Sequence, residues 1–148
     1  MTWGLGEELP PKHSTPGLEG LKELVYNKPE GGMLVLGIDP SLTGTGIAAI
    51  SLDPDGNVFG ATATTLKVPG KVDTIDRIFY IARNVTHWVG ICSDRNLSNI
   101  IIEDLPAMAK GAGHTGQAQG AIRYGISSGS QYNPCQVLAL APATLKKF

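Results

Sequence analysis

The clearest pattern along the chain is a series of short apolar runs, each closed by turn-forming residues. Residues 33–38 form a continuous apolar run, typical of a strand buried on both faces near the middle of a sheet. Pro40 cannot continue a central strand. Residues 47–52 and 58–65 predict two more strands, separated by the strong turn signal Asp-Pro-Asp-Gly at 53–56. Two successive hairpins indicate an antiparallel meander.

The second half of the chain alternates between helical and strand patterns. Asp73 is a suitable N-cap for a helix whose apolar face repeats at spacings of three and four, at Ile75, Ile78, Ala82, Val85 and Val89. After this helix the pattern predicts a strand at 99–102 and a loop rich in glycine and alanine at 105–116. A second helix at 117–125 and a last strand at 135–141 follow. A meander followed by crossovers predicts a mixed five-stranded α/β sheet flanked by helices.

The first 32 residues differ from the rest of the chain. Prolines and glycines interrupt any long periodic pattern there, although a short helix around Leu18–Tyr26 is compatible with it. We therefore expect an N-terminal arm at 1–32 and one folded core at 33–148. A chain of 148 residues suffices for a single domain with its own hydrophobic core.

Composition narrows the class of protein. The formal net charge of −1 gives no basic footprint of the kind that suggests nucleic acid, although a local basic groove can coexist with a neutral total. Cys92 and Cys135 lie in no CxxC or Cys/His cluster, so we expect two reduced, buried thiols, with a disulfide as the alternative, and no zinc site. Neither a membrane helix nor a signal peptide fits the sequence, so we expect a soluble, cytoplasmic protein.

Two acidic residues each follow a buried strand. Asp39 ends the first predicted strand and Glu103 the fourth, at the carboxyl ends where open α/β sheets place ligands. If these strands are neighbours, the carboxylates converge and repel each other unless a cation lies between them. Mg²⁺ is the natural candidate because it prefers oxygen ligands and bridges to phosphate, and in a two-metal site ions about 3.5–4 Å apart would flank an in-line attack on a phosphodiester. The alternative is that each acid only caps a turn or helix.

Motifs around both acids occur in an ordered set that covers residues 33–148. Leu-Gly-Ile-Asp-Pro-Ser at 36–41, followed by Thr-Gly-Thr-Gly at 43–46, resembles the first motif of the RuvC family of Holliday-junction resolvases. Ile-Ile-Ile-Glu at 100–103 resembles the second motif of that family. Residues 108–110 resemble the family's loop, and residues 116–120 the start of its next helix. Residues 138–142 fall where the family has its fifth strand, and residues 145–147 where it has the connection that follows.

The resemblance implies a ribonuclease H-like sheet, a homodimer, and Mg²⁺-dependent cleavage of branched DNA such as Holliday junctions, with Mn²⁺ as a substitute metal. By position it implies that Asp39 and Glu103 ligate metal and are catalytic. We expect DNA contacts from the loop, the following helix and the last residues, at Lys110, His114, Gln117, Lys146 and Lys147. The alternative for His114 is a solvated loop histidine, and the alternative for Lys146 and Lys147 is an ordinary polar chain end.

Three features depart from the family pattern. The family completes its site with acids on a helix after the fifth strand, whereas no Asp or Glu follows Asp104 here. No aromatic residue between Trp88 and Tyr124 could wedge into a junction, and the 32-residue arm is additional to the core motif. We therefore expect a core that lacks its C-terminal helix and a 148-residue chain that is weakly active or inactive.

Two other functions fit the same residues. A non-catalytic dimer that binds branched DNA would keep the fold without the chemistry, and the missing third acid favours it. An actin-like or sugar-kinase-type ATP-binding domain would use its first hairpin to cradle phosphates, and residues 37–46 fit that hairpin loosely. Such ATPases also need a second phosphate loop, which the sequence does not show.

Small residues in the helix predicted at 117–125 suggest how two copies could pair. Small side chains let helices approach closely, and the stretch contains Gly116, Ala118, Gly120, Ala121 and Gly125. A branched substrate with two equivalent strands also favours two sites related by a two-fold axis. The alternative is that these residues pack against the chain's own sheet.

Overall fold

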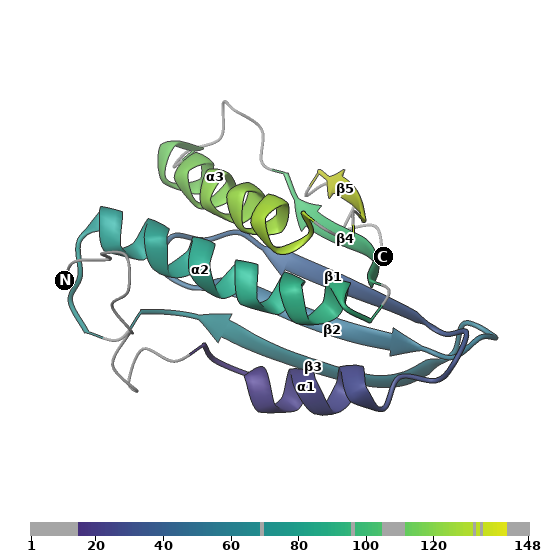
Figure 1. The fold of residues 1–148 in the computed structure, drawn as a ribbon. Coiled ribbons are helices and arrows are strands. Elements are labelled where there is room, and N and C mark those ends of the chain that lie inside the picture. Colours follow the sequence, from purple (N-terminus) through teal and green to yellow (C-terminus); the bar gives the residue numbers. More distant parts are fainter. Residues whose placement is uncertain are drawn as a thin grey trace.

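The computed structural model describes residues 15–68, 70–95, 97–104, 112–131, 133 and 135–141. In this part of the chain, three helices lie on one face of a five-stranded mixed sheet (Figure 1). The strands are β1 (Met33–Asp39), β2 (Thr45–Leu52), β3 (Val58–Leu66), β4 (Leu97–Glu103) and β5 (Gln136–Leu140). Their order in the sheet is β3-β2-β1-β4-β5, with the first three antiparallel and both β4 and β5 parallel to β1. This architecture confirms the predicted sheet.

The helices are α1 (Leu18–Tyr26), α2 (Thr74–Ser93) and α3 (Ala112–Gly129). The predicted N-cap of α2 is confirmed, because the Asp73 carboxylate accepts a hydrogen bond of 2.8 Å from the main-chain N–H of Asp76. The predicted start of α3 was wrong. Residues 112–116 are helical, although their glycines predicted a loop, because burial of the following turns against α2 outweighs the low helix propensity of glycine.

The hydrophobic core lies between the sheet and the helices. Side chains alternate along the strands, so Leu36 and Ile38 of β1 and Ile100 and Ile102 of β4 are buried under the helices. The opposite face is less covered in the described chain, where Ile50, between the buried Ala49 and Ser51 of β2, remains 39% exposed. The continuous apolar run of the first strand predicted burial on both faces, but the described chain buries one face of it.

Helix α1 belongs to the same core as the sheet. Leu21 and Val25 are buried against it, and the indole N–H of Trp88 donates a 2.9 Å hydrogen bond to the carbonyl oxygen of Pro16. A division of the chain at residue 32 therefore separates two segments that share one core. None of the helices in the described ranges has the length and apolar character needed to cross a bilayer.

Small residues of α3 are used largely within the chain. Ala118, Ala121 and Gly125 are buried, and a Cβ atom at Gly125 would lie 2.8 Å from the carbonyl oxygen of Ala82 in α2. Gly116 and Gly120 are exposed, and a Cβ atom at either would meet nothing within 4 Å. Burial within the chain thus accounts for three of the five small residues that suggested a dimer interface.

Candidate functional site

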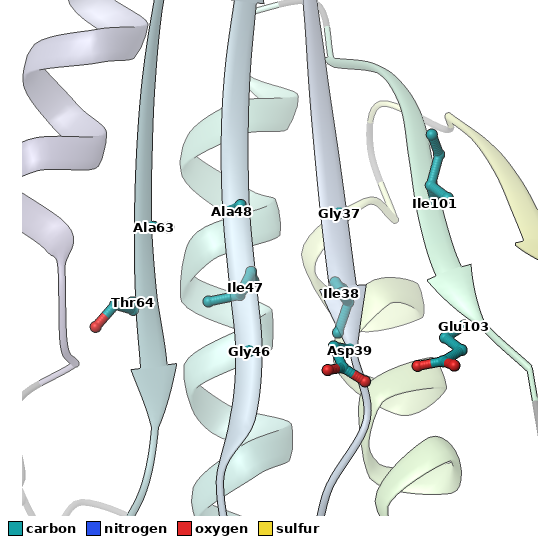
Figure 2. Close-up of a pocket in the computed structure, with 10 residues that line it drawn as sticks. All are labelled: Gly37, Ile38, Asp39, Gly46, Ile47, Ala48, Ala63, Thr64, Ile101 and Glu103. Carbon is teal, nitrogen blue, oxygen red and sulfur yellow. The ribbon is translucent and has the colours of Figure 1, made fainter. Parts of the chain in front are cut away.

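The two predicted acids lie side by side at one edge of the sheet. Strands β1 and β4 are paired in parallel with Ile38 opposite Ile102, so the next residues, Asp39 and Glu103, also occupy neighbouring positions. Because both isoleucines are buried under the helices, alternation places both acids on the opposite face. Figure 2 shows the carboxylates together at this edge, with that of Glu103 directed toward Asp39.

Helix α3 fixes the end of β4 from the helical side. The Gln119 side chain donates hydrogen bonds from Nε2 to the main-chain oxygen of Glu103 at 3.1 Å and to Oδ1 of Asp104 at 3.3 Å. The same Asp104 oxygen lies 3.9 Å from Nη2 of Arg123, and the Asp104 N–H donates to the carbonyl oxygen of Leu140 at 2.8 Å. These contacts hold the Asp104 side chain against α3 and keep the main chain of Glu103 in place.

A hydrogen-bonded turn fixes the end of β1. The buried Thr45 hydroxyl donates to the carbonyl oxygen of Ser41 at 2.7 Å and accepts from the Ser41 N–H at 3.2 Å. The hydroxyls of Ser41 and Thr43 share a further hydrogen bond of 3.1 Å. The turn begins two residues after Asp39, so it restrains the strand end that carries this carboxylate.

Several small residues contribute to the floor beside the acids. The acids border a shallow depression of about 460 Å³ whose lining includes Gly37, Gly46 and Ala48 (Figure 2). At Gly46, a Cβ atom would lie 3.6 Å from the Cβ atom of Asp39, in ordinary contact. Small side chains at these positions leave room for another molecule to approach the carboxylates.

Two carboxylates on adjacent strands fit a hard divalent cation. Neighbouring strands lie about 4.8 Å apart, so side chains at matching register positions can reach one ion. Carboxylate oxygens are the donors that Mg²⁺ prefers, and such sites commonly use one or two of them, with water and substrate phosphate completing the shell. Among the described residues, no group of three or more His, Cys, Asp or Glu side chains could hold a metal ion. Asp39 and Glu103 therefore fit a cation as a partial ligand set.

The other predicted site residues fall into three places. His114 is exposed in the first turn of α3 and lines a pocket beside the turn that follows Asp39. Gln117 is exposed and lines a groove between α2 and α3, away from the two acids. The three predicted DNA-contacting lysines, Lys110, Lys146 and Lys147, lie outside the described residues.

Arg77 and Gln119 were not predicted from the sequence. Arg77 lies in the first turns of α2 and lines the same pocket as His114. Its position follows from the topology, because a crossover helix between parallel strands runs antiparallel to them and begins at the edge where they end. Gln119 gave no such signal, since its role depends on how α3 packs on β4.

No protein-family model and no curated protein matches this chain. Among solved structures, it is similar to RuvC from Thermus thermophilus, with a TM-score of 0.59 and 21% identity over 78% of this chain and 68% of that chain. T. thermophilus RuvC in complex with Holliday junction substrate gives a TM-score of 0.58, with 18% identity over 78% of this chain and 67% of that chain. The yeast mitochondrial Holliday junction resolvase Ydc2 gives a TM-score of 0.50, with 15% identity over 87% of this chain and 59% of that chain.

This chain has a ribonuclease H-like fold. The described sheet, with its antiparallel meander and two parallel strands, is the one that the resemblance to the RuvC family implied. Identities of 15–21% show a shared fold.

Proposed function

We propose that this chain is the core of a metal-dependent endonuclease that binds and cleaves branched DNA such as Holliday junctions. The observation that carries the proposal is the convergence of Asp39 and Glu103 on one edge and one face of the sheet. Two anionic side chains in that arrangement favour a divalent cation, and a cation at a phosphodiester is the usual means of cleaving it.

Asp39 and Glu103 would hold Mg²⁺, with Mn²⁺ as a substitute. When bound, the ion would supply Lewis-acid polarisation of the phosphodiester and a water molecule of lowered pKa. The residues around the acids have their own tasks. Gly37, Gly46 and Ala48 leave the floor low enough for a nucleic-acid backbone to approach, and the turn at Ser41 keeps Asp39 in place.

The proposed substrate rests on the resemblance and on fold similarity. RuvC from T. thermophilus has been solved in complex with Holliday junction substrate, and its fold is similar to that of this chain. A four-way junction carries two equivalent strands, so we also propose a homodimer with two sites related by a two-fold axis. Of the predicted interface, Gly116 and Gly120 remain exposed to contribute to such a dimer.

The expected rate of cleavage is low. Two carboxylates hold a divalent ion less firmly than a larger set, and the described residues supply no third ligand of this type at the site. The proposal therefore predicts slow, metal-dependent cleavage, with faster cleavage by any form of the protein that adds a carboxylate to this edge. Binding of branched DNA without cleavage would favour the non-catalytic alternative instead.

The test is a cleavage assay with labelled four-way junction, flap and linear duplex, each with Mg²⁺, with Mn²⁺ and with chelator. Preferential cutting of branched substrates that Asp39→Asn abolishes and chelation prevents would support the proposal. Asp104→Asn is a matched control, because Asp104 neighbours the site in sequence but is engaged by Gln119 and Arg123. Equal activity of wild type and Asp39→Asn would refute the assignment.

A further inference from the structure

A second pocket opens on the other side of the strand end that carries Asp39. Its lining comes from three segments that are distant in sequence: the turn after β1, the first turns of α2 and the first turn of α3. The described residues that line it are Pro40, Ser41, Leu42, Thr43, Thr74, Arg77 and His114. The pocket has a volume of about 350 Å³ and is distinct from the depression beside the two acids.

The chemistry of this pocket suits an anion with several oxygen atoms. Its described lining includes the guanidinium of Arg77, the imidazole of His114 and three hydroxyl groups, but no carboxylate. Arg77 is partly buried and forms no salt bridge within the described part of the chain. A guanidinium offers five N–H donors in a planar fork that matches two phosphate oxygens, and hydroxyl groups can donate to the others.

Local structure holds these groups in place. Thr74 and Arg77 are three residues apart on α2, so both side chains lie on one side of the helix. The Asp73 carboxylate caps α2 by accepting from the Asp76 N–H, which engages that acid in the helix. The hydroxyls of Ser41 and Thr43 are already hydrogen-bonded to each other, which orients them beside Arg77.

We propose that this pocket binds a backbone phosphate of the nucleic acid and so positions the neighbouring phosphodiester at Asp39 and Glu103. The inference rests on the proposed function and adds to it a phosphate subsite with Arg77 as its main positioning residue. Ser41 lies two residues after Asp39, so a nucleic-acid strand that crosses this edge of the sheet passes both sites.

The test measures DNA binding without metal, so that binding is separated from cleavage. Wild type, Arg77→Gln and Arg95→Gln are titrated with labelled four-way junction at several salt concentrations. Arg95 is the matched control, because it follows the far end of α2 and lies over the ring of Tyr26. Both variants lose one positive charge, but only one loses it at the pocket.

We expect Arg77→Gln to weaken DNA binding about tenfold and to lower the slope of log K against log salt by about 1, the change expected for one lost phosphate contact. Arg95→Gln should change neither quantity. Arg77→Lys should retain the salt slope, because it keeps the charge, and should recover part of the affinity. A purely structural role for Arg77 would not reproduce this dependence on salt, and thermal melting of each variant checks the fold.

Equal binding by Arg77→Gln and wild type, or an equal loss in Arg77→Gln and Arg95→Gln, would overturn the inference. If wild type still cuts branched DNA in that case, the proposed nuclease function stands without this subsite. If wild type neither binds nor cuts DNA, both proposals fail. Titration with inorganic phosphate distinguishes the source of the anion, because tight binding of free phosphate that depends on Arg77 would overturn the assignment to DNA.

Discussion

Replacing Gly125 by alanine tests the close packing of α3 on α2. A Cβ atom at this position would lie 2.8 Å from the carbonyl oxygen of Ala82 and 2.9 Å from Cβ and Cγ1 of Val85. Backbone and a β-branched side chain are the atoms in the way, so α2 and α3 must move apart to admit the methyl group. Gly120, on the same helix, is the matched control, because a Cβ atom there meets nothing within 4 Å.

The two substitutions should change the free energy of unfolding in opposite directions. Glycine is less favourable than alanine in a helix interior by about 1 kcal/mol, so Gly120→Ala should raise the free energy of unfolding by about 0.5–1 kcal/mol. At Gly125 the same gain is opposed by overpacking, which costs about 1–3 kcal/mol. With the clash directed at the backbone, Gly125→Ala should lower the free energy of unfolding by about 1–2 kcal/mol.

Urea denaturation of the two variants and wild type, at two protein concentrations, measures these differences. A transition that shifts with concentration would report a dimer, and the comparison would then be made at one concentration. Stabilisation by Gly125→Ala equal to that by Gly120→Ala would refute the close α2–α3 packing. Loss of dimer in Gly120→Ala alone would assign the exposed side of α3 to the interface.

Two further predictions concern buried titratable groups. Burial raises the pKa of the Cys92 thiol to about 12, with a smaller contribution from Cys135, so iodoacetamide at pH 8 should label Cys135 first, and equal rates would contradict this. Burial, aided by the positive charge of Arg83, lowers the pKa of His87 below its usual 6.5. As the pH falls, His87 is therefore protonated in the unfolded chain before it is protonated in the folded chain. Stability should therefore decrease below about pH 6.5, and His87→Gln should flatten that decrease; an unchanged pH dependence in His87→Gln would contradict this.

The meander and α2 could be predicted because their signals are local. The turn at Asp53, the apolar alternation around it and the cap at Asp73 each lie within a few residues of the element they define. Asp39 and Glu103 could be named for the same reason, since each follows its own apolar run. Their adjacency is a different matter, because it depends on the pairing of β1 with β4 across more than sixty residues.

Features that depend on packing could not be predicted. Residues 112–116 read as a loop because glycine is a poor helix former, and burial against α2 overrides that preference. Ala118 and Gly125 suggested a partner chain, but small residues that face a neighbouring helix look the same whether that helix belongs to the same chain or another. Arg77 gave no signal within its own helix; only the crossover topology, in which α2 begins at the edge where β1 ends, could have placed it beside Ser41.

The measurement that most directly tests the central claim is a calorimetric titration of Mn²⁺ or Mg²⁺ into wild type, Asp39→Asn, Glu103→Gln and Asp104→Asn. If Asp39 and Glu103 form one cation site, either substitution should abolish binding, which is weak in wild type because the described ligand set is partial. Asp104→Asn should retain wild-type binding, since that carboxylate is engaged by Gln119 and Arg123. Binding that persists unchanged in both Asp39→Asn and Glu103→Gln would contradict the account.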